Sequence, residues 1–559
     1  PEDRDVKVKA EIRLQNKGSQ AIDSIHYNLS DDWETEIKIP NAELVMQDDS
    51  LDYHIYALAK PLKPGESMDV VIHTKYETKG FENNRGNTSI IRNGTFINNM
   101  AVLPSMGYYE GAELSDKNDR KKYDLPPKDR MPELDSSNKA LRMSNYLTDG
   151  RADWVKMETY ISTSADQIAI APGKLIKEWQ EEGRNYYHYK VEQASQLFCS
   201  FISADYEVAK RDWNGISLEV YYDEKHDYNI EMMLDAIQAS LAYYTKNFGP
   251  YYHEQARIIE FPRYATFAQA FPGTMPYSES FGFITNLEDS TKNNVVNAVI
   301  AHEMAHQWWA HQVIGAKMQG GTMLSESFAE YSSLMVMKQK KDDLGMKEFI
   351  KYDFNRYLRG RGSEREKELP LYKVENQGYL HYGKGSLILY ALQDYIGEDK
   401  VNQALSDFLA EYRYAEPPYP TSLDFLRHLE KQVPDSLNYL IEDWFKKITL
   451  YDLRIDEATF TEKAEGDYLV EIKLINKKMY ADTIGNETET PMNEWVDIGI
   501  FKDQDAEESI LMKRVKLATG EQELRFTVNE KPAQAAIDPK RLLIERIYDD
   551  NYESIKEKD

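Results

Sequence analysis

The spacing of apolar residues changes twice along the chain, and this change narrows the choice of folds more than any other feature. Residues 6–15 read V-K-V-K-A-E-I-R-L-Q, the period-two pattern of a strand with one face in water. From Asn229 to Phe248, apolar residues recur at every third or fourth position, which indicates an amphipathic helix. Alternation returns after Tyr451. We therefore expect β structure, then helices, then β structure again.

At 559 residues the chain is too long for one hydrophobic core. We predict a multidomain α+β fold. It has an N-terminal β domain (1–225), a mainly α domain (226–449) and a C-terminal β-sandwich-like domain (450–559). Further helices are predicted at Asn294–Val313, Leu324–Lys338, Ser386–Tyr395, Val401–Tyr412, Ser422–Lys431 and Leu437–Lys447.

The strongest chemical signal is the string H-E-M-A-H at residues 302–306, inside a predicted helix. Two histidines four positions apart lie on one helix face, so the imidazoles of His302 and His306 can reach one metal ion. Glu303 lies beside them and can act as general base toward water at the metal. A helix with two ordinary histidines is the alternative interpretation of a five-residue pattern.

A second helix supplies the third metal ligand. Nineteen residues separate His306 from Glu326 in L-S-E-S-F-A-E-Y. Two imidazoles and one carboxylate leave a position open for water, the ligand set of catalytic zinc sites. We therefore predict one Zn²⁺ ion held by His302, His306 and Glu326. Glu330, one turn further on, is either the partner of a ligating histidine's other ring nitrogen or a surface glutamate.

Charge and hydropathy exclude some functions. The formal net charge of −27 opposes binding to nucleic acid and to anionic membranes. No window approaches the roughly 18 consecutive apolar residues of a membrane span, so we expect a soluble domain. Because strand-like alternation follows Pro1 at once, we also expect sequence to have preceded it.

The strings H-E-M-A-H-Q-W-W and L-S-E-S-F-A-E-Y resemble the aminopeptidase N family of zinc metallopeptidases. This resemblance implies a thermolysin-like catalytic domain in the middle of the chain and a peptide substrate with a free N-terminus. Tyr382-Gly383-Lys384-Gly385 is similar to the family's Y-x-K-G element, which implies that Tyr382 stabilises the oxyanion. The family usually has eighteen residues before the ligating glutamate, one fewer than this chain.

The amine-binding G-A-M-E-N motif of the family has only an imperfect counterpart, G-T-M-P-Y-S-E-S-F-G-F-I-T, which begins at Gly273. One alignment, anchored on the residues after the motif, makes Glu279 the ligand of the substrate's amino group. The other starts at Gly273, a candidate substrate-binding residue, and places Pro276 there. We prefer Glu279, because an ammonium group requires a carboxylate.

Two alternative functions remain open at this stage. The altered motif and the nineteen-residue spacing favour a thermolysin-like endopeptidase. A non-catalytic docking module of a membrane assembly is the other alternative. Segments near residues 103 and 535 resemble a bacterial branch in which such a domain follows a permease-like membrane region. That branch implies a membrane-embedded region before Pro1 and tethering to a bacterial membrane; the compartment is otherwise unreadable from the sequence.

Overall fold

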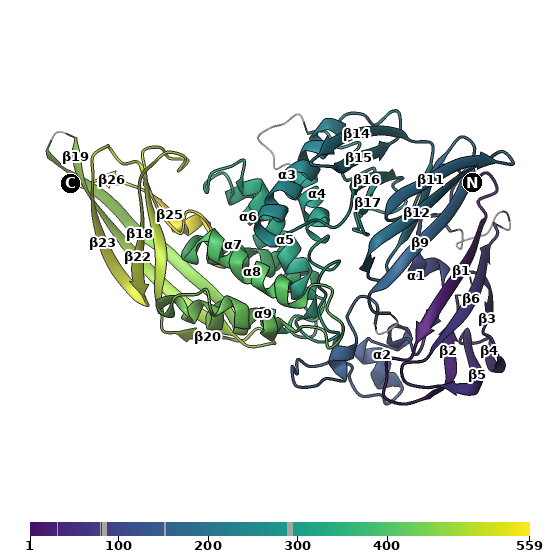
Figure 1. Cartoon of the computed structure of the whole chain (residues 1–559). Coiled ribbons are helices and arrows are strands. Elements are labelled where there is room, and N and C mark those ends of the chain that lie inside the picture. Colours follow the sequence, from purple (N-terminus) through teal and green to yellow (C-terminus); the bar gives the residue numbers. More distant parts are fainter. Residues whose placement is uncertain are drawn as a thin grey trace.

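The computed structural model describes residues 1–30, 32–78, 80, 87–149, 152–287, 295–464 and 466–558. Two β-rich regions lie at opposite ends of an elongated molecule, and helices lie between them (Figure 1). The predicted order of a β-rich region, a helical domain and a second β-rich region is therefore confirmed. The domain limits at residues 225 and 449 stay predictions.

The amino-terminal region consists of short antiparallel sheets. Strand β1 pairs with β6 along its whole length, with Val6 opposite Tyr76 and Gln15 opposite Ser67. Alternate apolar residues of β1 pack with the buried Val70 and Ile72 of β6, which explains the period-two pattern. The sheets contain β1 (Val6–Gln15), β6 (Ser67–Tyr76) and β3 (Glu34–Lys38); β4 (Ala42–Asp48), β5 (Tyr53–Leu62), β2 (Ile22–Asn28) and β8 (Ser105–Met106); β10 (Ile168–Ile170), β13 (Ser200–Ala204) and β7 (Thr95–Asn98); and β11 (Lys174–Glu181), β12 (Arg184–Ser195) and β9 (Val155–Ser164).

A mixed four-stranded sheet joins this region to the helices. Its order is β14 (Glu207–Trp213), β15 (Ile216–Tyr222), β16 (Gln255–Phe261) and β17 (Thr274–Ser278), and the last three strands are parallel. All residues of β16 and β17 are buried, as expected for parallel strands covered on both faces. This sheet runs across the predicted limit at residue 225 and lies beside α4 (Val295–Ala305), the helix that contains His302 (Figure 1).

The helical region matches most of the predicted helices within a few residues. It contains α3 (Ile230–Phe248), α4 (Val295–Ala305), α5 (Glu326–Lys338), α6 (Lys347–Ser363), α7 (Gly385–Ile396), α8 (Glu398–Tyr412) and α9 (Ser422–Leu429), and the short helices α1 (Asn99–Val102) and α2 (Lys117–Lys122) lie earlier in the chain. Helix α6 was not predicted, because charged residues surround its few buried apolar positions. The predicted helix Leu437–Lys447 is instead a short π-helix, η7 (Ile441–Lys446).

The predicted helix Asn294–Val313 was wrong at its carboxyl end; Asn294 itself lies outside the described residues. Helix α4 ends at Ala305. Shortly after it, Ala310 takes a positive φ of 132° and Trp309 forms a β-bridge with Val313. A non-glycine residue at that φ cannot continue a right-handed helix, so the chain turns directly after the second histidine.

The carboxyl-terminal region packs on the helices without a break in the core. One buried apolar cluster runs from Leu218 of β15 through the helices to Ile555. Its strands are β20 (Glu487–Thr490), β19 (Asp467–Ala481), β18 (Ile448–Ala464), β26 (Lys556–Glu557) and β23 (Gly520–Val528), with β22 (Ser509–Ala518), β21 (Asn493–Phe501), β24 (Gln534–Ile537) and β25 (Tyr552–Ser554) in a second sheet. Among the described helices, none is long and apolar enough to cross a membrane.

Candidate metal centre

His302 lies on α4 and His306 directly follows its last residue, and the other face of this helix is packed. Ile300, Ala301, Met304 and Ala305 of α4 are fully buried, and helix α5 packs against α4. Trp309 Nε1 donates a hydrogen bond to Ser332 Oγ of α5 at 3.0 Å, which ties the end of the histidine segment to α5. The local sequence places His302 and His306 four residues apart. The packing of α4 on α5 then brings Glu326 to the two histidines.

Three side chains converge at the contact between these helices. The Nε2 atoms of His302 and His306 lie 3.1 Å apart. Glu326 Oε2 lies 3.5 Å from His302 Nε2 and 3.4 Å from His306 Nε2. The structure therefore brings together the three residues predicted as metal ligands, one donor atom from each, within 4.8 Å of one another.

The outer nitrogen of each imidazole faces an oxygen atom of the protein. His306 Nδ1 lies 2.8 Å from the carbonyl oxygen of Trp309, and His302 Nδ1 lies 2.5 Å from Glu330 Oε2. A proton held on each Nδ1 leaves the Nε2 lone pairs facing the centre, which is the arrangement of histidines that bind metal. Glu330 thus lies where the interpretation as partner of a ligating histidine places it.

The donor set fits a divalent cation. Glu326 Oε2 is buried and accepts no hydrogen bond from the residues that the structure describes, and an unsatisfied buried carboxylate oxygen is costly. Burial would raise the pKa of Glu326, but His306 and His302 hold it well below its ordinary value. Two nitrogens and one oxygen suit zinc.

Glu303 lies next to the histidines but is not committed to a partner. Its side chain is 7% exposed, and within the described part of the chain no hydrogen bond or ion pair engages its carboxylate. Burial raises the pKa of Glu303 above its ordinary value. A carboxyl group in this state is free to accept and return a proton.

Tyr382 reaches the centre from a π-helix, η5 (Tyr379–Lys384), which leads into α7. Its ring centroid lies 5.7 Å from that of His302. Burial, followed by the negative charges of Glu326 and Glu303, raises the pKa of Tyr382 above its ordinary value, so the phenol stays protonated as a donor. A π-helical turn often marks a functional position, but no sequence pattern predicts it here.

Residues 232–444 match the peptidase family M1 domain, and this segment carries all six site residues described above: His302, Glu303, His306, Glu326, Glu330 and Tyr382. The chain carries a peptidase family M1 domain. The predicted resemblance to the aminopeptidase N family is thereby confirmed, whereas the resemblance to permease-fused proteins stays a prediction.

Several curated proteins are similar to part of the chain. Tricorn protease-interacting factor F2 of Thermoplasma volcanium is 23% identical over 283 residues, which cover 49% of this chain and 34% of that protein. Human endoplasmic reticulum aminopeptidase 2 is 23% identical over 265 residues, covering 45% and 28%. Probable aminopeptidase 1 of Sulfurisphaera tokodaii is 23% identical over 222 residues, covering 38% and 28%. The similarity thus spans about a third or less of each relative's length.

The two candidate substrate-binding residues of the M1 domain occupy different surroundings. Gly273 has a φ of +59°, and its amide donates to the buried Gln307 Oε1 at 2.8 Å, so the turn before β17 is fixed to the residue after His306. Glu279 follows β17 and accepts from the amide of Arg263 at 3.2 Å. Among the described contacts, Glu279 has none with the three metal-ligand candidates.

Glu279 belongs to a separate polar cluster at the carboxyl ends of the parallel strands. Its carboxylate lies within 4.8 Å of ligand atoms of His226 and Glu260. His226 Nδ1 and Glu260 Oε1 are 2.5 Å apart, and burial raises the pKa of Glu260 to about 7. Adjacent carboxylates suit a cation, but no contact among the described residues joins this cluster to the metal centre.

Tyr277 of β17 is a residue that sequence reasoning missed. It is fully buried, and its hydroxyl has no partner among the described residues. Burial, followed by the charge of Glu303, raises the pKa of Tyr277 well above its ordinary value. Its position in G-T-M-P-Y, where the family motif has its last residue, was the only available signal.

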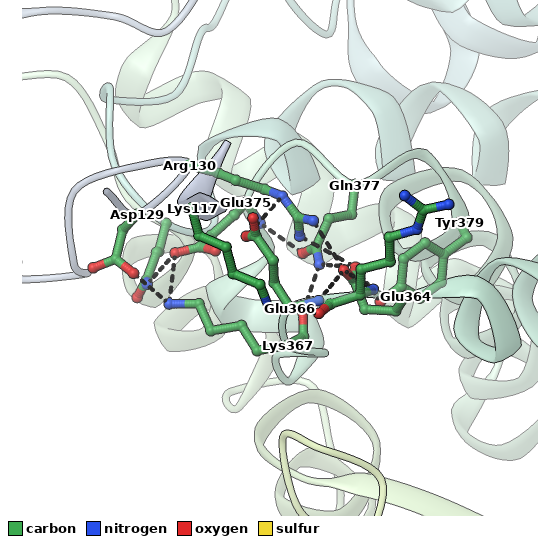
Figure 2. A network of polar contacts seen from close by, with 11 residues as sticks. Lys117, Asp129, Arg130, Glu364, Glu366, Lys367, Glu375, Gln377 and Tyr379 are labelled. Carbon is green, nitrogen blue, oxygen red and sulfur yellow. Dashed lines mark hydrogen bonds and ion pairs between the residues drawn. The ribbon is translucent and has the colours of Figure 1, made fainter. Parts of the chain in front are cut away.

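A polar network holds the M1 domain to a segment of the amino-terminal region (Figure 2). Arg130 donates to both carboxylate oxygens of Glu364, at 2.9 and 3.2 Å. Glu364 Oε2 also accepts from Tyr379 Oη at 3.1 Å and from Gln377 Nε2 at 2.8 Å. Tyr379 is the first residue of the π-helix that contains Tyr382. The network therefore links Arg130, which lies outside the M1 domain, to the segment that positions Tyr382.

Proposed function

We propose that the chain is a zinc-dependent aminopeptidase that removes the first residue of peptides with a free N-terminus. The observation that carries this proposal is the convergence of His302, His306 and Glu326 beside an uncommitted, buried Glu303. The M1 domain and the aminopeptidases among its relatives support the same reaction.

His302, His306 and Glu326 would hold one Zn²⁺ ion. When bound there, zinc would polarise the scissile carbonyl and make water a better nucleophile. Glu303 takes a proton from the attacking water while the oxygen of that water forms a bond to the carbonyl carbon. As the carbon–nitrogen bond breaks, Glu303 gives that proton to the leaving amine. No covalent bond between enzyme and substrate is needed.

Tyr382 donates its hydroxyl proton in a hydrogen bond to the negative charge that develops on the carbonyl oxygen. A donor placed in advance lowers the barrier because it needs no reorganisation during the reaction. The half-buried ring beside His302 and the raised pKa of the phenol support this role.

Exopeptidase specificity rests on Glu279, which we propose as the group that binds the substrate's ammonium. The neighbouring Glu260 offers a second carboxyl group within 4.8 Å of Glu279. The second candidate, a thermolysin-like endopeptidase, is favoured by the lack of any described contact between Glu279 and the metal-ligand residues. Tethering of the chain to a bacterial membrane stays a prediction.

A comparison of one short peptide with its N-acetylated form tests the function. Zinc-loaded protein is incubated with each, with and without a zinc chelator, and products are identified by mass. We expect stepwise loss of N-terminal residues from the free peptide alone, stopped by chelator and by Glu303→Gln. Internal cleavage of both peptides would favour the endopeptidase instead. Cleavage of neither would refute both enzymatic functions and favour a binding module.

A further inference from the structure

Arg356 lies next to the proposed oxyanion donor, and no hydrogen bond or ion pair to another described residue engages its guanidinium. It lies on α6, is half-buried, and its guanidinium carbon lies 4.1 Å from the ring centroid of Tyr382. Apart from this stacking contact, it makes no hydrogen bond or ion pair with the residues that the structure describes. A guanidinium carries five N–H donors, and stacking on a ring leaves these in-plane donors free.

The nearby carboxylates do not fill those donors. Asp353, one turn earlier on α6, is 2% exposed and accepts from Ser386 Oγ at 2.9 Å instead. Glu330 lies against His302 Nδ1. The Arg356 nitrogens are not among the described buried atoms that lack a partner, so solvent reaches them in the half-buried side chain. A carboxylate supplied by a ligand can replace that water with charge-assisted hydrogen bonds.

We propose that Arg356 binds a carboxylate of the peptide substrate close to the bond that is cleaved. This inference rests on the proposed peptidase function and adds a substrate class to it. The carboxylate is either the C-terminus of a short peptide or an acidic side chain near the scissile bond. A guanidinium binds a carboxylate through two parallel hydrogen bonds.

The distance between the metal ligands and Arg356 limits which carboxylate of a substrate can reach Arg356. The Tyr382 ring lies 5.7 Å from the His302 ring and 4.1 Å from Arg356. Arg356 is therefore within on the order of 10 Å of the metal ligands, or about three extended residues. The net charge of −27 repels acidic peptides as a whole, so a local unpaired cation is needed to favour them.

Kinetics on paired peptides test the proposal. The first pair is the dipeptide Leu-Gly and its C-terminal amide, and the second is Leu-Glu amide and Leu-Gln amide; each pair differs in one carboxylate. We expect kcat/KM to favour the carboxylate form by about 10- to 100-fold in at least one pair, from the usual strength of charge-assisted hydrogen bonds. The pair that shows the effect identifies the source of the carboxylate.

Arg356→Gln should abolish that preference, so that kcat/KM becomes equal within each pair, because it removes the contact to the carboxylate. Arg356→Lys keeps the charge but loses the paired hydrogen bonds, so part of the preference should remain. Arg359→Gln is the matched control, because Arg359 is an exposed residue on the same helix and its loss should change nothing.

Two kinetic results would overturn the proposal. One is a carboxylate preference that is absent from the wild type or survives in Arg356→Gln. The other is an equal loss of kcat/KM on all four peptides in Arg356→Gln, which would mean that Arg356 only holds the Tyr382 ring.

A binding measurement distinguishes failure of this proposal from failure of the proposed peptidase function. Calorimetry with zinc-loaded Glu303→Gln protein needs no turnover, so it gives a result even if no peptide is cleaved. About tenfold tighter binding of the carboxylate peptides, lost in Glu303→Gln/Arg356→Gln, would support the site without hydrolysis. Equal binding of both members of each pair would refute it.

Discussion

Replacing Arg130 by Met should loosen the segment that joins the amino-terminal region to the M1 domain. The substitution removes two charge-assisted hydrogen bonds to Glu364. Buried bonds of this kind contribute about 1.5–3 kcal/mol each. The Arg130 side chain is 34% exposed and Glu364 10%, so solvent screening reduces the loss. We expect a destabilisation of about 1–2 kcal/mol for docking of the segment.

Hydrogen exchange in residues 110–135 measures this change directly. A loss of one to two kcal/mol raises the open fraction about 5- to 30-fold, so exchange should accelerate by that factor. The control is Lys122→Met in the same segment, which removes an ion pair to Asp119 whose two side chains are 69% and 46% exposed. Exchange in Arg130→Met no faster than in this control would refute the reasoning.

The effect of Arg130→Met also depends on pH. Burial would raise the pKa of Glu364, but the hydrogen bonds from Arg130 and Gln377, with a backbone amide, lower it from 4.5 to about 2. A lowered carboxylate pKa stabilises the docked state above the unperturbed value. The difference between wild type and variant should therefore be complete above pH 4.5 and disappear as pH falls toward 2.

Three further substitutions test the centre. Glu330→Gln should weaken zinc binding about 10- to 100-fold, measured by competition with a chelator, because it removes the negative charge beside His302 Nδ1; the exposed Glu348→Gln should not. Tyr382→Phe should lower kcat about 100- to 1000-fold with zinc affinity unchanged, and a smaller loss would exclude it as the oxyanion donor. Glu279→Gln should raise KM for free peptides at least about tenfold; an unchanged KM would assign the ammonium to another group.

The sequence alone was sufficient for whatever depends on local spacing. Period two in residues 6–15 and helical spacing from Asn229 predicted the order of β and helical regions, because each period follows from backbone geometry. For the same reason, the separation of four positions between His302 and His306 predicted that both lie on one helix face. Family resemblance added Tyr382, which no local pattern would have singled out.

Tertiary structure decided whatever depends on contacts between distant segments. Only the packing of α4 on α5 brings Glu326 to the two histidines, and only the turn at Ala310 brings the Trp309 carbonyl to His306. Arg356 was not predicted, because only the fold shows that its guanidinium lies over the Tyr382 ring without a hydrogen-bond partner among the described residues. Glu279 was predicted from its charge, yet the fold places it in a different cluster. Spacing along the chain determines on which face of a helix or strand a side chain lies. The tertiary fold determines which other segments contact that face.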